Sequence, residues 1–134
     1  IRLKDAPLAE RLRTIHDCLN ALIQEHRPTC MAVEQVFVGK NASSALKLGH
    51  ARGAAILVAA LQQLPVSEYA PRAIKQAVAG TGAANKEQVQ QMVVRLLGLS
   101  SAPAADAADA LAAALCHAHS APVYQQLAQV PVYD

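Results

Sequence analysis

Residues 31–38 read MAVEQVFV, and this stretch decides the fold class of the 134-residue chain. Together with Cys30 it forms a valine-rich apolar run that is too short for a stable buried helix, so we expect an interior strand over 30–38. Before it, apolar residues recur at helical spacing over residues 8–26, which predicts an amphipathic helix. A helix followed by a buried strand is typical of layered α/β folds, and we expect that class here.

Prolines and glycines divide the rest of the chain into short elements. We expect the end of a strand at 1–3, a helix capped by Ser43 or Ser44 that runs to about Leu64, a strand at 66–70, and helices over 71–79, 85–97 and 105–119. No internal repeat or low-complexity linker interrupts this order. We therefore predict one domain over 1–119, followed by a loosely attached tail over 120–134, which contains two prolines and has weak periodicity.

The composition narrows the class of protein. Hydrophobic residues make up 53% of the chain and aromatic residues 3%, so small and aliphatic side chains must supply most of the core. The net charge of +2 permits nucleic-acid binding but does not argue for it. Three scattered cysteines without a CxxC spacing indicate reduced thiols, and the longest near-apolar run, 54–61, is too short to span a bilayer. We expect a soluble, cytoplasmic protein with no membrane partner.

Acidic residues stand out at two places within apolar sequence. In DAADAL, residues 106–111, Asp106 and Asp109 lie one helical turn apart in an alanine-rich helix, so their carboxylates share a helix face. Glu34 is the only acid in 31–38, and a carboxylate inside a buried strand must be paired, protonated or bound to a cation. If the helix packs across the end of the strand, the three acids converge. The ordinary alternative is that Asp106 caps its helix and Asp109 faces water.

Converging carboxylates indicate a site for a divalent cation. Like charges a few ångströms apart resist full ionisation unless a cation lies between them. Mg²⁺ takes oxygen ligands and binds through one or two carboxylates together with substrate phosphate oxygens. Two such ions, roughly 4 Å apart, activate a water and stabilise the leaving oxygen in phosphodiester cleavage. The pattern therefore favours phosphodiester chemistry.

Five ordered blocks of the sequence resemble the RuvC family of Holliday junction resolvases, the crossover junction endodeoxyribonucleases. The blocks are AVEQVF (32–37), KNASSALKLGHARG (40–53), PRAIKQAVAGTG (71–82), NKEQVQQMV (85–93) and DAADALAAALCHAH (106–119). The resemblance covers about residues 1–119 and implies an RNase H-like α/β fold, a mixed sheet flanked by helices. It also implies a homodimer that makes symmetric nicks in four-way-junction DNA during homologous recombination and DNA repair, in cooperation with the RuvA and RuvB branch-migration proteins.

The resemblance also assigns catalytic roles to individual residues. Glu34, Asp106 and Asp109 match the family's catalytic metal ligands, which implies a requirement for Mg²⁺ or Mn²⁺ with two ions per active site. Lys75 and Lys86 match basic catalytic residues that act near the cleaved phosphate.

Further residues are candidates for contact with DNA. Phe37, the only phenylalanine of the chain, matches a family residue that stacks on a junction base, although a lone phenylalanine at a strand end is otherwise more typical of a core. We expect a set of basic residues, in loops or helix starts around the site, to track phosphates with salt-sensitive affinity: Lys40, Lys47, Arg52 and Arg72. Taken singly, each of them is an ordinary solvated charge.

The sequence as written departs from the family pattern at its beginning. Family members start with a strand carrying an Asp-Pro-Gly motif whose aspartate is the first metal ligand, and this sequence begins after it. Asp5 is no substitute, because it precedes Ala6-Pro7 in a predicted turn. The first hypothesis is a metal-dependent endonuclease. The alternative is a non-cleaving module that binds four-way-junction DNA because the leading aspartate is missing, and a third hypothesis is an RNase H-like nuclease acting on another DNA structure.

Overall fold

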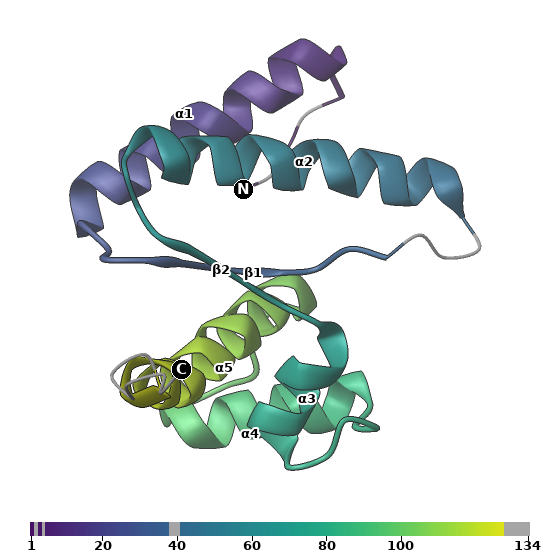
Figure 1. The fold of residues 1–134 in the computed structure, drawn as a ribbon. Coiled ribbons are helices and arrows are strands. Elements are labelled where there is room, and N and C mark those ends of the chain that lie inside the picture. Colours follow the sequence, from purple (N-terminus) through teal and green to yellow (C-terminus); the bar gives the residue numbers. More distant parts are fainter. Residues whose placement is uncertain (2, 4, 38–40, 128–134) are drawn as a thin grey trace, which may run out of the picture. The chain divides into compact units, whose positions relative to one another are not determined.

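The computed structural model describes residues 1, 3, 5–37 and 41–127, which form five helices and two strands (Figure 1). In chain order the elements are α1 (Leu8–His26), β1 (Met31–Glu34), α2 (Ala42–Leu61), β2 (Val66–Tyr69), α3 (Pro71–Ala79), α4 (Lys86–Leu97) and α5 (Ala105–Leu127). Strands and helices alternate through the first part of this order. The α/β class predicted from the sequence is confirmed.

The strands β1 and β2 pair with each other in parallel. The amide of Met31 donates to the carbonyl of Pro65 (2.9 Å), and the amide of Gln35 donates to that of Tyr69 (2.8 Å), so the register advances in the same direction on both strands. The strand predicted over 30–38 is therefore shorter in the structure, since its regular pairing extends only as far as β2 runs beside it.

The strand end predicted at 1–3 is not formed by its described residues. Ile1 and Leu3 belong to no strand, and Arg2 lies outside the described residues.

Within the predicted 1–119 domain the structure separates two compact units. The first comprises Ile1–Met31 and Val36–Ser67, and the second comprises Ala32–Gln35 and Glu68–Asp134. The boundaries between them fall within or next to the two strands.

The first unit is the helix pair α1 and α2. Ile15 of α1 and Val58 of α2 are buried, and hydrogen bonds between amide side chains join the helices near their C-terminal ends. Gln62 donates from Nε2 to Asn20 Oδ1 (2.7 Å) and accepts from Gln24 Nε2 through Oε1 (3.0 Å). These polar contacts orient the two helices, because each one needs a specific geometry.

The ends of α2 differ from the sequence prediction. Its N-cap is Asn41, whose side chain accepts a hydrogen bond from the amide of Ser44 (3.1 Å), so the predicted caps at Ser43 or Ser44 are wrong. The helix ends at Leu61 and not near Leu64, because the chain turns into a left-handed conformation at Gln63 (φ 57°) before it reaches β2.

The second unit packs α3, α4 and α5 around one apolar core. Val93 is fully buried, and a buried valine of this kind stabilises the fold by roughly 1.5–3 kcal/mol relative to an exposed one. Small side chains on α5 let it approach α3 and α4 closely. The buried members of this core are Tyr69, Ile74, Val78, Ala84, Val89, Val93, Ala112, Ala113 and Cys116.

Local sequence determines where α3 and α4 begin and end. Pro71 starts α3, where the missing amide costs nothing, and Gly80 ends it in the left-handed region (φ 75°). A capping box starts α4: Asn85 accepts from the amide of Gln88 (2.8 Å), and the Gln88 side chain accepts from the amide of Asn85 (2.8 Å). Gly98 ends α4 (φ 61°). Each of these boundaries was predicted from the sequence.

Helix α5 continues to Leu127, whereas the sequence predicted its end at His119 and a loose tail over 120–134. The proline at position 122 removes one backbone donor but does not end the helix. The predicted helix end at His119 is wrong, whereas the loosely attached tail over 120–134 stays a prediction, and residues 128–134 lie outside the described part. None of the helices described here has both the length and the apolar character needed to span a membrane.

Candidate active site

A cavity of about 300 Å³ lies in the second unit, with charged side chains gathered over an apolar floor. The floor consists of Ile74, Val89 and Ala112, which are buried. The residues that line the cavity are Glu34, Pro71, Ile74, Lys75, Lys86, Val89, Asp109 and Ala112. A space of this size accommodates one small group such as a phosphodiester, whereas a DNA duplex is too large for it.

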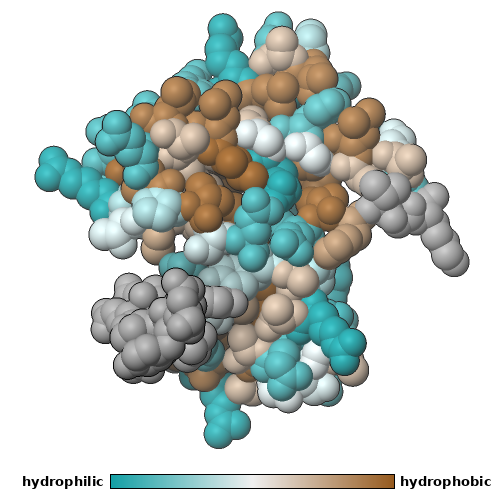
Figure 2. Space-filling view, viewed as in Figure 1, coloured by the Kyte–Doolittle hydropathy of each residue, from teal (hydrophilic) through white to brown (hydrophobic). Residues whose placement is uncertain are grey.

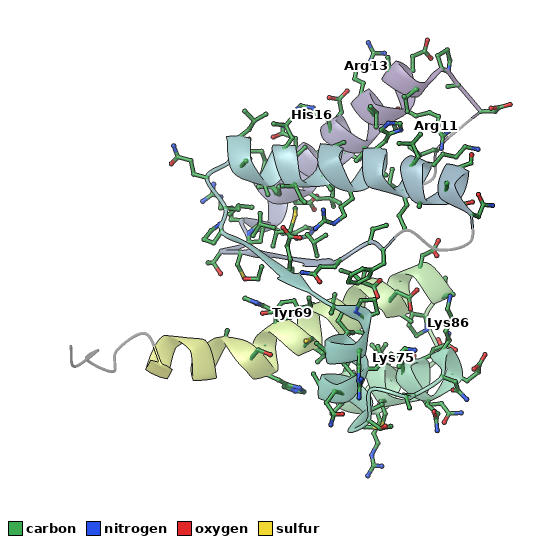
Figure 3. The ribbon with its side chains drawn as sticks, turned by 45° about the vertical axis from the view of Figure 1, so that its right-hand side comes forward. Arg11, Arg13, His16, Tyr69, Lys75 and Lys86 are labelled. Atoms are coloured by element: carbon green, nitrogen blue, oxygen red, sulfur yellow. The ribbon has the colours of Figure 1, made fainter. Side chains whose placement is uncertain are left out.

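Four elements each supply one charged side chain to the cavity. Glu34 is the last residue of β1. Lys75 lies one turn into α3, Lys86 is the first residue of α4, directly after its capping box, and Asp109 lies one turn into α5. Figure 3 shows Lys75 and Lys86 on these neighbouring helices. The site thus depends on how the whole second unit packs.

Glu34 differs from its predicted environment. It was expected inside a buried strand, but it ends β1 and its side chain is exposed. Even so, partial loss of hydration raises the pKa of the Glu34 carboxyl above its ordinary value, and the negative charge of Asp109 raises it further. The positive charges of Lys86 and Lys75 act in the opposite direction. Asp109, Lys86 and Lys75 are therefore each close enough to Glu34 to influence its carboxyl.

The donor set of this cavity fits a hard divalent cation. Two carboxylates that repel each other are the ligands that such an ion prefers, and its charge would relieve their repulsion. The predicted third acid, Asp106, is exposed in the first turn of α5 and does not line the cavity. Among residues 1, 3, 5–37 and 41–127, no group of three or more histidine, cysteine, aspartate or glutamate side chains is arranged to hold a metal.

The residues predicted to contact DNA lie on both units. Phe37, in the first unit, is 65% exposed and therefore not part of a core. Arg72 is exposed in the first turn of α3, as expected. Lys47 is exposed and Arg52 half-buried, but both lie within α2 of the first unit, not in a loop or a helix start as predicted. Lys40 lies outside the described residues.

Arg72 is packed against the loop that follows its own helix. A Cβ atom added at Gly82 would lie 2.6 Å from Arg72 Cγ, so a side chain there would displace the arginine. Gln76 braces the same loop, since its Nε2 donates to the Gly80 carbonyl (2.8 Å) and its Oε1 accepts from the Gly82 amide (3.1 Å). The side chain of Arg72 thus lies against Gly82, next to Pro71, which lines the cavity.

One contact near the site was missed by sequence reasoning. Tyr69, the last residue of β2, places its hydroxyl 2.8 Å from Nδ1 of His117 on α5, and the two rings meet edge to face with centroids 5.9 Å apart. No spacing in the sequence indicates this pair, because it joins segments that only tertiary packing brings together.

Comparison with known proteins decides the family. The family model described as crossover junction endodeoxyribonuclease RuvC matches residues 1–117. The chain belongs to the RuvC family. This result confirms the resemblance that the five sequence blocks indicated.

Individual RuvC proteins agree with this assignment. Crossover junction endodeoxyribonuclease RuvC of Marinobacter nauticus is 62% identical over 119 residues, which are 89% of this chain and 68% of the relative. The protein of the same name from Idiomarina loihiensis is 61% identical over 113 residues, 84% of this chain and 64% of the relative. The chain thus spans about two thirds of the length of these RuvC relatives.

A solved RuvC structure shares the fold. Thermus thermophilus RuvC in complex with Holliday junction substrate matches with a TM-score of 0.85 and 40% identity, over 92% of this chain and 75% of that one. The RNase H-like fold expected for a RuvC protein is therefore confirmed. The name shared by the relatives is that of a hydrolase acting on DNA.

Proposed function

We propose that this chain acts as a RuvC endonuclease that hydrolyses phosphodiester bonds in Holliday junctions. One observation carries the proposal: Glu34 and Asp109, remote in sequence, line one cavity together with Lys75 and Lys86. Membership in the RuvC family supports it, as does the likeness to a relative solved with a Holliday junction. We assign this function to residues 1–119.

In this proposal, Glu34 and Asp109 hold a divalent cation, Mg²⁺ or Mn²⁺. When bound, two such ions would lower the pKa of a water and stabilise the leaving oxygen of the cleaved bond. The proposal keeps Asp106 as a further ligand, since it precedes Asp109 by one helical turn and shares its face of α5.

Lys75 and Lys86 serve the phosphate in this scheme. Two ammonium groups next to the carboxylates would offset the negative charge of a phosphodiester entering the cavity, and a preorganised charge of this kind costs little reorganisation during the reaction. Exposed Phe37 is proposed to stack on a junction base. The proposed phosphate contacts outside the cavity are Lys40, Lys47, Arg52 and Arg72.

The proposal includes a homodimer, and its candidate interface is on the first unit. A groove of about 470 Å³ runs between α1 and α2, with Gly49, Gly53 and Leu57 among its lining residues, and Arg13 and His16 of α1 at its side (Figure 3). Figure 2 shows apolar side chains gathered over these helices. Exposed leucines on one helix are typical of a surface that another protein covers. Those of α2 are Leu46, Leu48, Leu57 and Leu61, of which Leu57 lines the groove.

Two further parts of the proposal rest on family membership alone. One is cooperation with the RuvA and RuvB branch-migration proteins, and the other is a cytoplasmic location.

Junction cleavage by carboxylate variants tests the proposal. A synthetic four-way junction is incubated with Mg²⁺ and the full-length protein. The parent protein is compared with three variants: Glu34→Gln, Asp106→Asn and Asp109→Asn. We expect cleavage to fall about 100-fold or more in each variant, while junction binding in Ca²⁺ is kept. The control is Glu87→Gln, which changes an exposed acid in the first turn of α4.

Two results would contradict the proposal. If the three variants nick as fast as the parent, the carboxylate assignment is wrong. If the parent binds four-way junctions and leaves them intact, a binding module replaces the nuclease. If the parent cleaves flaps or linear duplex as fast as four-way junctions, the protein is a nuclease with a different DNA substrate.

A further inference from the structure

Tyr69 lies where three elements of the candidate site meet. Its carbonyl accepts a hydrogen bond from the amide of Gln35, the residue that directly follows Glu34 (2.8 Å). Only Ala70 separates it from Pro71, the first residue of α3 and a lining residue of the cavity. The backbone of Tyr69 thus connects the strand end that carries Glu34 with the helix that carries Lys75.

The side chain of Tyr69 makes the connection to α5. It is 8% exposed, and its hydroxyl lies 2.8 Å from His117 Nδ1. A buried phenol needs such a partner, because an unpaired hydroxyl in a core is costly. His117 and Asp109 are both on α5, so this contact joins the helix that carries Asp109 to the last residue of β2.

We propose that Tyr69 is a positioning residue for the candidate metal site. By holding Gln35 through its carbonyl and His117 through its hydroxyl, it sets the separation between Glu34 and Asp109. Such a constraint matters here because the two carboxylates repel each other, and metal ligands must be held within about 0.5 Å of their working geometry. The inference rests on the proposed function, since it takes these two acids as ligands.

Tyr69→Phe isolates the hydroxyl, because the buried ring is kept. The probe is Mn²⁺ alone. Its binding to the DNA-free protein is measured by electron paramagnetic resonance and by calorimetry. We expect the Mn²⁺ dissociation constant to rise about 3- to 10-fold, the effect of losing one hydrogen bond that supports the ligands. The metal concentration for half-maximal junction cleavage should rise to a similar extent, whereas junction affinity in Ca²⁺ should not change.

Variants of His117 test the same contact from the α5 side. His117→Ala removes the partner and should match Tyr69→Phe, with no added effect in the double variant. His117→Asn places an amide group near the position of Nδ1 and should restore Mn²⁺ affinity toward the parent value. The matched control is Ser120→Ala, which removes a hydrogen bond within α5 to the Cys116 carbonyl (2.7 Å) and should leave Mn²⁺ binding unchanged.

The outcomes separate this inference from the proposed function. Parent-like Mn²⁺ affinity in both Tyr69→Phe and His117→Ala would overturn the positioning role, even if Glu34→Gln abolishes cleavage. Equal weakening by Ser120→Ala would also overturn it, because the effect would then reflect helix stability alone. If the parent binds no Mn²⁺ and Glu34→Gln cleaves normally, the proposed function fails and the positioning role fails with it.

Discussion

Glu34 at the end of β1 and Asp109 on α5 interact electrostatically within one cavity, although they are remote in sequence. Partial burial raises the pKa of the Glu34 carboxyl, the negative charge of Asp109 raises it further, and Lys86 and Lys75 oppose that rise. A protein that keeps two repelling carboxylates together gives up some stability at the site. In the RuvC family this arrangement is understandable if a cation occupies the space between them.

The first prediction concerns pH and stability. Folding raises the pKa of Glu34 above the ordinary value of 4.5. At any pH between the ordinary and the raised pKa, the folded protein therefore binds more protons than the unfolded chain. The contribution of Glu34 to the free energy of unfolding must then fall as pH rises through that window. In metal-free protein, the gain in melting temperature from Glu34→Gln should be larger at pH 7 than at pH 4.

Asp109→Asn supplies the control for this measurement. It removes the charge that helps to raise the pKa of Glu34. In the Asp109→Asn background, Glu34→Gln should therefore raise the melting temperature by less than it does in the parent. A gain that is independent of pH, or that grows in acid, would contradict the prediction.

The second prediction concerns Phe37. Because its side chain is 65% exposed, Phe37→Ala should leave the free energy of unfolding within about 0.5 kcal/mol of the parent. Loss of base stacking should weaken junction binding by about 1–3 kcal/mol, measured in Ca²⁺, and Phe37→Trp should retain it. Leu96→Ala, at an exposed leucine of α4, is the control. Equal binding by Phe37→Ala and the parent would exclude the stacking role.

The third prediction concerns Arg72 and Gly82. If Arg72 contacts a phosphate, Arg72→Ala should lower the slope of log affinity against log salt by about 1. Gly82→Ala should reproduce part of this loss, because its methyl group would meet Arg72 Cγ, and the double variant should be no worse than Arg72→Ala. Arg95→Ala, near the far end of α4, should keep the parent slope. Additive losses would show that Gly82 acts independently.

The fourth prediction concerns the capping box that precedes Lys86. Asn85→Ala should lower the free energy of unfolding by about 1 kcal/mol in urea, since the amide of Gln88 loses its partner. Asn85→Asp keeps the acceptor and should restore stability. Because Lys86 is the first residue of α4, we also expect Asn85→Ala to slow cleavage. The control is Gln90→Ala, which removes a hydrogen bond to the Pro103 carbonyl (2.7 Å) and should slow cleavage less. Comparable slowing by both would contradict a role in placing Lys86.

The fifth prediction concerns the groove on the first unit. No atom lies within 4 Å of a Cβ added at Gly53, so Gly53→Leu should not disturb the fold and should raise helix propensity in α2. A bulky side chain in the groove should nevertheless block a second copy, and the mass in solution should fall to that of a monomer. A dimer that is unaltered in Gly53→Leu would exclude the groove as the dimer interface. The control is Gln63→Ala, which lies after the end of α2.

Sequence reasoning succeeded where the cause is local. Pro71, the Asn85–Gln88 pair and Gly98 act on backbone groups within one turn, so the bounds of α3 and α4 were predictable. It failed where the cause is tertiary. The length of β1 depends on where β2 runs beside it.

By itself, the sequence determined the α/β class, the helix boundaries set by caps and turns, and the RuvC membership carried by five blocks of residues. Only the tertiary structure decided that Glu34 and Asp109 share a cavity with two lysines, that Asp106 does not line it, and that Tyr69 contacts His117. The physical reason is range: capping and turn preferences act over three or four residues, whereas these contacts depend on how β1, β2 and the helices of the second unit pack against one another.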